Sequence, residues 1–188
     1  MIRWHALVPI KQGINSKSRL GEALSQEERD LLSLRMARHV LSELGHCNGI
    51  SEVTILSNAR PDWWSGGWVA DCGKGLNAEI NGWRQTSGAG AILIIHADLP
   101  LLQAEDVRHI LDIAEIEGIA LATDRAGEGS NALAIADGRP FEFQFGPNSR
   151  RLHLTQSPEM TVVECINLSA DIDTLDDLLF ARERGFTG

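Results

Sequence analysis

The chain has 188 residues, 43% hydrophobic and 23% charged, which are ordinary proportions for one soluble globular domain spanning residues 1–188. Its formal net charge of −9 excludes a general basic surface of the kind that holds nucleic-acid backbone. An anionic ligand must therefore be bound locally, and a free nucleotide or a phosphorylated metabolite fits this requirement. No apolar run approaches membrane-spanning length, so we expect neither a nucleic acid nor a membrane as partner.

The three cysteines, Cys47, Cys72 and Cys165, are isolated and show no C-x-x-C spacing. This spacing indicates neither a disulfide framework nor a zinc site, and it favours a reducing compartment. The first apolar strand begins almost at once, without a signal-peptide pattern. We therefore expect a cytoplasmic protein.

The first element expected is a buried strand at 6–8, followed by Pro9 and a polar loop. This loop carries three cations, Lys11, Lys17 and Arg19. Open α/β sheets bind their ligands just beyond the carboxyl ends of their strands. The pattern predicts a phosphate-binding loop, although an ordinary loop with solvated basic side chains would show the same residues.

Strands and helices then alternate along the chain. Ser25 and Glu28 match a capping box that begins a helix, and Gly45 is a candidate for its end. We expect further strands at 53–56, 68–70, 91–95, 119–123, 131–135 and 161–166, and further helices from about 77, over 104–117, and near 149 and 175. Because the later strands lack clear helices between them, this order predicts a three-layer α/β fold with a mixed, mainly parallel sheet.

Two acidic motifs are candidates for a Mg²⁺ site. Asp98 follows the most hydrophobic of the expected strands, where an open α/β sheet has its ligand crevice. Asp171 and Asp173 are two residues apart, so in extended chain their carboxylates can face one cation. Capping offers an alternative for both motifs, because Asp98 could cap a turn or helix, and Asp173 or Thr174 could begin the last helix.

Two glycine-bearing loops, 127–131 and 145–149, carry hydroxyl groups. Glycine lets backbone amides approach an oxyanion, and Ser130 and Ser149 can each add a donor. A helix beginning near Ser149 would contribute free amides as well. Ordinary turns have the same composition, and His153 alone indicates a packed or surface histidine rather than a general base.

Six motifs, taken in order, resemble the 2-phospho-L-lactate guanylyltransferases of deazaflavin coenzyme F-420 biosynthesis, which are related to the molybdenum-cofactor nucleotidyltransferases. The motifs are Val8–Lys11 with Lys17–Leu20, Gly75–Asn77, Ala97–Leu101, Ser130–Leu133, Phe145–Gly146 with Ser149 and His153, and Asp171–Thr174. They span nearly the whole chain. Each motif is common alone, whereas six in this order are specific.

The resemblance implies a Rossmann-like fold of the nucleotide-diphospho-sugar transferase type. It implies an enzyme that joins the GMP moiety of GTP to a small phosphorylated acid, such as 2-phospho-L-lactate or phosphoenolpyruvate, and releases pyrophosphate. In such a reaction the acceptor phosphate is already anionic, so no covalent enzyme nucleophile is needed, and catalysis consists of positioning and charge neutralisation.

The resemblance also implies a role for each of four groups of residues. The ligands of Mg²⁺ would be Asp98, Asp171 and Asp173. The groups around the acceptor's phosphate and carboxylate would be Ser130, Gly146 and Ser149. The groups along the triphosphate would be Lys11, Lys17 and Arg19, and those near the guanine would be Leu76 and Asn77. The catalytic residues would be Lys11, Lys17 and Asp98.

Two other hypotheses stay open on the sequence. One is a nucleotidyltransferase of the same fold that acts on molybdopterin or a phosphosugar, although the opening loop lacks the Gly-Gly-rich start with arginine expected of those relatives. The other is a non-catalytic nucleotide-binding protein, which would have no need to keep Asp98, Asp171 and Asp173 together. The sequence is compatible with a homodimer.

Overall fold

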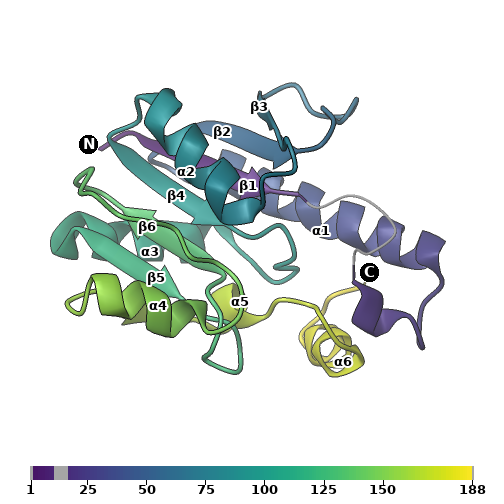
Figure 1. Ribbon diagram of the computed structural model, residues 1–188. Coiled ribbons are helices and arrows are strands. Elements are labelled where there is room, and N and C mark those ends of the chain that lie inside the picture. The colour runs from purple at the N-terminus through teal and green to yellow at the C-terminus, as the bar shows by residue number, and fades with distance from the viewer. Residues whose placement is uncertain (1, 11–16, 188) are drawn as a thin grey trace.

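A computed structural model describes residues 2–10 and 17–187. Its strands are β1 (Trp4–Pro9), β2 (Ile50–Ser57), β3 (Gly67–Ala70), β4 (Ala91–Ile95), β5 (Ile119–Ala122), β6 (Ala132–Ile135) and β7 (Thr161–Val163). They form one sheet in the order β3-β2-β1-β4-β6-β5-β7 (Figure 1). β1 is parallel to β2 and β4, whereas β6 is antiparallel to both of its neighbours. The predicted mixed, mainly parallel sheet is confirmed.

The helices are η1 (Ser18–Leu20), α1 (Gln26–His46), α2 (Leu76–Ser87), α3 (Ala104–Glu117), α4 (Ser149–Gln156), α5 (Ile166–Ser169) and α6 (Leu175–Glu183). α1 and α3 cover one face of the sheet, and α2 and α4 cover the other (Figure 1). β4, in the middle of the sheet, is buried on both faces, as its apolar run predicts. In the described part of the chain, no helix is long and apolar enough to cross a membrane.

Two of the expected boundaries are wrong. The capping box of Ser25 and Glu28 does begin α1, but Gly45 lies inside the helix, which ends at His46. The left-handed conformation that ends many helices at glycine occurs here at Gly49, after the helix has finished. The last strand stops at Val163 instead of 166, and the chain enters the short helix α5, where Ile166 is exposed rather than buried.

The C-terminal helix packs beside the beginning of the chain. Leu178 and Ala181 of α6 share a buried apolar cluster with Leu20 of η1 and Met36 of α1. The same cluster contains Ile172, which precedes the helix. Segments separated by about 150 positions therefore lie side by side, as Figure 1 shows for η1 and α6. This packing brings the segment after β1 to the acidic motif before α6.

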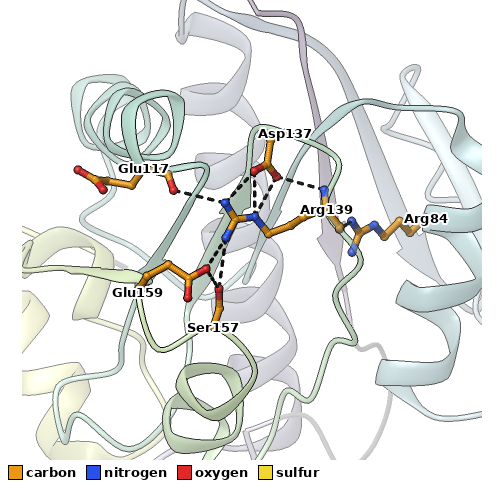
Figure 2. A network of polar contacts seen from close by, with 6 residues as sticks. All are labelled: Arg84, Glu117, Asp137, Arg139, Ser157 and Glu159. Atoms are coloured by element: carbon orange, nitrogen blue, oxygen red, sulfur yellow. Dashed lines mark hydrogen bonds and ion pairs between the residues drawn. The ribbon is translucent and has the colours of Figure 1, made fainter.

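A polar network centred on Arg139 joins the far end of the sheet to the helices (Figure 2). The Arg139 guanidinium donates to Asp137 Oδ2 at 2.7 Å, to Glu159 Oε1 at 2.6 Å and to the carbonyl oxygen of Glu117 at 3.5 Å. Arg84 of α2 in turn donates to the carbonyl oxygen of Arg139. One side chain thus ties the turn after β6 to the end of α3 and to the turn before β7.

Candidate active site

A cavity of about 640 Å³ opens at the carboxyl edge of the parallel strands. It lies where the chain order reverses, because β2 and β3 extend the sheet on one side of β1 and β4 lies on the other. Ligands of open α/β sheets bind at such a point. The lining side chains that follow the strands are Ile10 and Lys17 after β1, Asp71 after β3, and His96 and Asp98 after β4. The volume is that of a small-molecule site.

One cation and two carboxylates meet at the floor of this cavity. Lys17 Nζ donates to Asp98 Oδ2 and, at 2.8 Å, to Asp173 Oδ1. Burial would lower the pKa of Lys17, but the two carboxylates outweigh it and raise the pKa above its ordinary value. Burial would likewise raise the pKa of Asp98, but Lys17 holds it below its ordinary value. Both groups are therefore charged at neutral pH.

Asp171 adds a third carboxylate beside those of Asp98 and Asp173. Its Oδ1 accepts a hydrogen bond of 3.0 Å from Asn131 Nδ2. Burial, together with the negative charges of Asp98 and Asp173, raises the pKa of Asp171 to about 7, even though Asn131 and Lys17 act to lower it. The backbone N–H of Ile172 donates to the carbonyl oxygen of Asp98 at 3.2 Å, which fixes the two acidic motifs against each other. The three carboxylates carry more negative charge than Lys17 neutralises.

The chemistry of these donors fits a hard divalent cation. Mg²⁺ usually binds through one or two carboxylates together with phosphate oxygens of the substrate. Asp98 Oδ1 is buried and has no hydrogen-bond partner among the described residues, so this oxygen is available as a ligand. Within residues 2–10 and 17–187, no three His, Cys, Asp or Glu side chains already stand in the arrangement of a metal site. The carboxylates could thus hold a metal ion only with further oxygen ligands or after Lys17 shifts.

A second polar region lies around the buried face of α4. Ser149 and His153 are the buried residues of this helix, and they lie one turn apart on the same face. His153 Nδ1 is 3.0 Å from the hydroxyl oxygen of Ser130. Ser149 is 1% exposed, and its hydroxyl has no hydrogen-bond partner in the part of the chain that the structure describes. Two buried hydroxyl groups therefore gather here with unused hydrogen-bonding capacity.

The backbone offers fewer free N–H donors in this region than the sequence predicts. α4 does begin at Ser149, but the N–H groups of Ser149 and Arg150 donate to the carbonyl oxygens of Gly146 and Glu128, both at 3.1 Å. Gly146 has a φ of 119°, a conformation that side chains rarely adopt, so the loop requires glycine there. The hydroxyl groups, rather than these two amides, are the available donors.

Aromatic contacts connect the two regions. The ring of His96, in the cavity wall, lies 5.4 Å from the ring of Phe145, which packs edge-on against His153 at 5.1 Å. Asn77, at the start of α2, binds the same segment, since its amide accepts from Phe145 N at 2.7 Å and donates to Phe145 O at 3.0 Å. The amide group of Asn77 is therefore engaged in holding this loop beside the cavity.

The structure brings some of the predicted site residues together and separates others. The predicted residues that line the cavity are Lys17, Arg19, Leu76, Asp98 and Asp173. Those that lie around the start of α4, outside this lining, are Ser130, Gly146 and Ser149. Lys11 falls outside the described residues. The roles of all these residues stay predictions.

Three further residues belong to the region without having been assigned a role from the sequence. Asn131 links the loop that carries Ser130 to Asp171, and His96 and Asp71 line the cavity. His96 and Asp71 each follow directly on a strand, β4 and β3, and that position is a usable signal. Nothing in the sequence shows that Asn131 reaches Asp171, 40 residues later.

Comparisons with known proteins agree on family and fold. A family model described as "Guanylyl transferase CofC like" matches residues 4–181. A phosphoenolpyruvate guanylyltransferase of Nocardia farcinica is 34% identical over 194 residues, covering 96% of this chain and 86% of its own length. An enzyme of the same name from Rubrobacter xylanophilus is also 34% identical, covering 92% and 90%.

A solved structure from Desulfovibrio desulfuricans G20, described as a nucleotide-diphospho-sugar transferase, shares the fold. It superposes with a TM-score of 0.74 at 17% identity and covers all of this chain and 90% of its own. This likeness bears on architecture alone, and it agrees with the Rossmann-like, nucleotide-diphospho-sugar transferase type of sheet described above.

Proposed function

Since the chain belongs to the family of CofC-like guanylyl transferases, we propose that it transfers GMP from GTP to phosphoenolpyruvate and releases pyrophosphate. The family resemblance places such a product in deazaflavin coenzyme biosynthesis, with 2-phospho-L-lactate as the alternative acceptor. The observation that carries the proposal is the meeting of Lys17, Asp98 and Asp173 at the floor of a cavity of nucleotide size.

GTP occupies this cavity. Its triphosphate lies along Lys17 and Arg19, and Lys11 belongs to the same loop of the sequence. Its guanine lies toward the opposite wall, where Leu76 provides an apolar surface and Asp71 a carboxylate. Asn77, at the edge of this wall, uses its amide to hold the Phe145 segment, which leads to Gly146 of the acceptor site.

The acceptor binds at the start of α4, next to the cavity. Ser130 and Ser149 offer hydroxyl donors to its phosphate and carboxylate, and the Gly146 backbone lets these anionic groups come close. The His96–Phe145 contact joins this site to the GTP cavity. The two substrates thus meet where β4 ends and β6 begins.

The reaction needs positioning and charge neutralisation more than proton transfer. A phosphate oxygen of the acceptor attacks the α-phosphorus of GTP, and the bond to the pyrophosphate leaving group breaks in line. Lys17 neutralises charge that develops on the phosphates. Asp98, Asp171 and Asp173 would hold Mg²⁺, which when bound supplies further positive charge to the same oxygens.

Pyrophosphate release tests the proposal. The purified protein is incubated with Mg²⁺, with GTP, CTP or ATP as donor, and with phosphoenolpyruvate, 2-phospho-L-lactate, a sugar phosphate or no acceptor. We expect release with GTP and a phosphorylated three-carbon acid, and its loss in Asp98→Asn. Release with CTP and a sugar phosphate would contradict the proposed substrates, and no release with any pair would contradict an enzymatic role.

A further inference from the structure

His153 is a fully buried polar side chain whose two ring nitrogens both have partners. Its Nδ1 lies 3.0 Å from Ser130 Oγ, and its Nε2 lies 3.0 Å from the backbone nitrogen of Gln144. It lies on α4, between the loop that carries Ser130 and the segment that carries Gln144. The proposed reaction gives this imidazole no part, although it touches a residue of the acceptor site.

The partners of His153 determine which nitrogen carries the proton. A backbone N–H can only donate, so Nε2 must accept from Gln144 and carries no hydrogen. Burial lowers the pKa of His153 to about 4, which keeps the ring neutral at physiological pH. A neutral ring with a bare Nε2 has its hydrogen on Nδ1. The imidazole is therefore the donor and the Ser130 oxygen the acceptor in the bond between them.

This direction of donation leaves the Ser130 hydroxyl hydrogen unused. Among residues 2–10 and 17–187, no acceptor receives it. Since the oxygen is held by His153 and the residue is 3% exposed, the position of the oxygen is fixed and its hydrogen must point away from His153. Ser149, one turn before His153 on the same helix face, presents a second hydroxyl that has no partner among the described residues. Two buried hydroxyl groups around the start of α4 are thus available as donors, which is a binding arrangement for an oxyanion.

We propose that His153 is a positioning residue that fixes the Ser130 hydroxyl as a hydrogen-bond donor to the phosphate or carboxylate of the acceptor substrate. The inference rests on the proposed function, because it takes Ser130 to contact the acceptor. His153 touches neither substrate itself. It acts by holding the donor in the orientation that the acceptor requires, so its loss weakens acceptor binding and leaves GTP binding intact.

The protonation pattern can be measured without any substrate. In the protein labelled with ¹⁵N-histidine, two-dimensional spectra that correlate ring nitrogens with ring protons distinguish the two neutral tautomers, and His153→Asn assigns the signals. We expect His153 in the Nδ1–H form between pH 6 and 8. The Nε2–H form, or a protonated ring in this range, would overturn the inference regardless of whether the protein is a guanylyltransferase.

Steady-state kinetics test the positioning role. His153→Leu removes both hydrogen bonds, whereas His153→Asn keeps an amide donor near the place of Nδ1. We expect His153→Leu to raise the KM for the acceptor about tenfold with the KM for GTP unchanged within twofold, as the loss of one hydrogen bond to an anion predicts. His153→Asn restores most of the loss. A purely structural role would instead raise both KM values, or neither.

A double-variant comparison separates the remaining explanations. If His153 acts through Ser130, His153→Leu adds nothing to the acceptor KM of Ser130→Ala. Additive effects would overturn the inference. Circular dichroism and thermal unfolding show whether each variant is folded. If His153→Leu is not folded, His153→Asn is compared with the wild type instead. Absence of turnover in the wild-type protein with every acceptor would refute the proposed function, and the inference with it, while leaving the tautomer result standing.

Discussion

Replacing Asp171 by asparagine shows how much the charge of Asp171 destabilises the folded protein, separately from its part in turnover. The asparagine side chain keeps an oxygen that can accept from Asn131, and it removes the charge that burial and Asp98 disfavour. Because the pKa of Asp171 is raised from 3.8 to about 7, the folded protein retains a proton between pH 4 and 7 that the unfolded chain loses. Stability therefore falls as the pH rises through this window, and the variant escapes that loss.

The size of the effect follows from the same shift. About three pH units at about 1.4 kcal/mol each set a ceiling of about 4 kcal/mol. Since Asp171 is partly exposed and solvent screens its charge, we expect Asp171→Asn to gain about 1 to 2 kcal/mol over the wild type at pH 8. At pH 4 the two proteins should be equally stable within about 0.5 kcal/mol.

Urea unfolding followed by circular dichroism, at several pH values and without divalent cations, measures this difference. Asp173→Asn is the matched control, because it removes a carboxylate that Lys17 already neutralises at 2.8 Å and should bring no gain at pH 8. An Asp171→Asn protein less stable than wild type at pH 8, or a difference independent of pH, would refute the electrostatic reasoning. In the presence of Mg²⁺ and both substrates the same variant should lose turnover.

Three other substitutions distinguish support of the fold from function. Arg139→Met should lower the free energy of unfolding by about 2 kcal/mol. It should change neither KM, since the network of Figure 2 lies away from the cavity. A changed KM would contradict this separation. Ser149→Ala should be at least as stable as the wild type, because the Ser149 hydroxyl is buried and has no partner within residues 2–10 and 17–187. It should nevertheless raise the acceptor KM about tenfold. A loss of stability would show that the hydroxyl supports the fold. Asn77→Ala should raise the acceptor KM more than the GTP KM, because it frees the Phe145 segment. A larger rise in the GTP KM in kinetic assays would place Asn77 on the nucleotide side.

The local elements of the fold could be predicted from short stretches of sequence. The five apolar residues of β4 and the apolar spacing of α3 gave the observed bounds, because a buried strand and an amphipathic helix have distinct periods. The helix α5 could not be predicted, since the run 161–166 has the same apolar character as a strand. Pairing stops at Val163 because its partner strand β5 ends at Ala122, directly opposite, and Ile166 is exposed in the folded chain.

The candidate site was predictable in its residue types and not in its contacts. Asp98 stood out because it follows β4, and Asp171 and Asp173 because of their spacing. The bond between Lys17 and Asp173 joins residues 156 positions apart, and it depends on α6 packing against η1 and α1. Asn131 and His153 take their partners from distant segments in the same way, so neither role is readable from a local motif.

Phosphorus NMR of the complete reaction tests the proposed transfer most directly. With Mg²⁺, GTP and phosphoenolpyruvate, we expect the three signals of GTP to be replaced by pyrophosphate and by a coupled pair from a new phosphoanhydride between GMP and the acceptor phosphate. Asp98→Asn should leave the GTP signals unchanged. Inorganic phosphate with GDP, or pyrophosphate with free GMP, would show hydrolysis instead of transfer and would contradict the account.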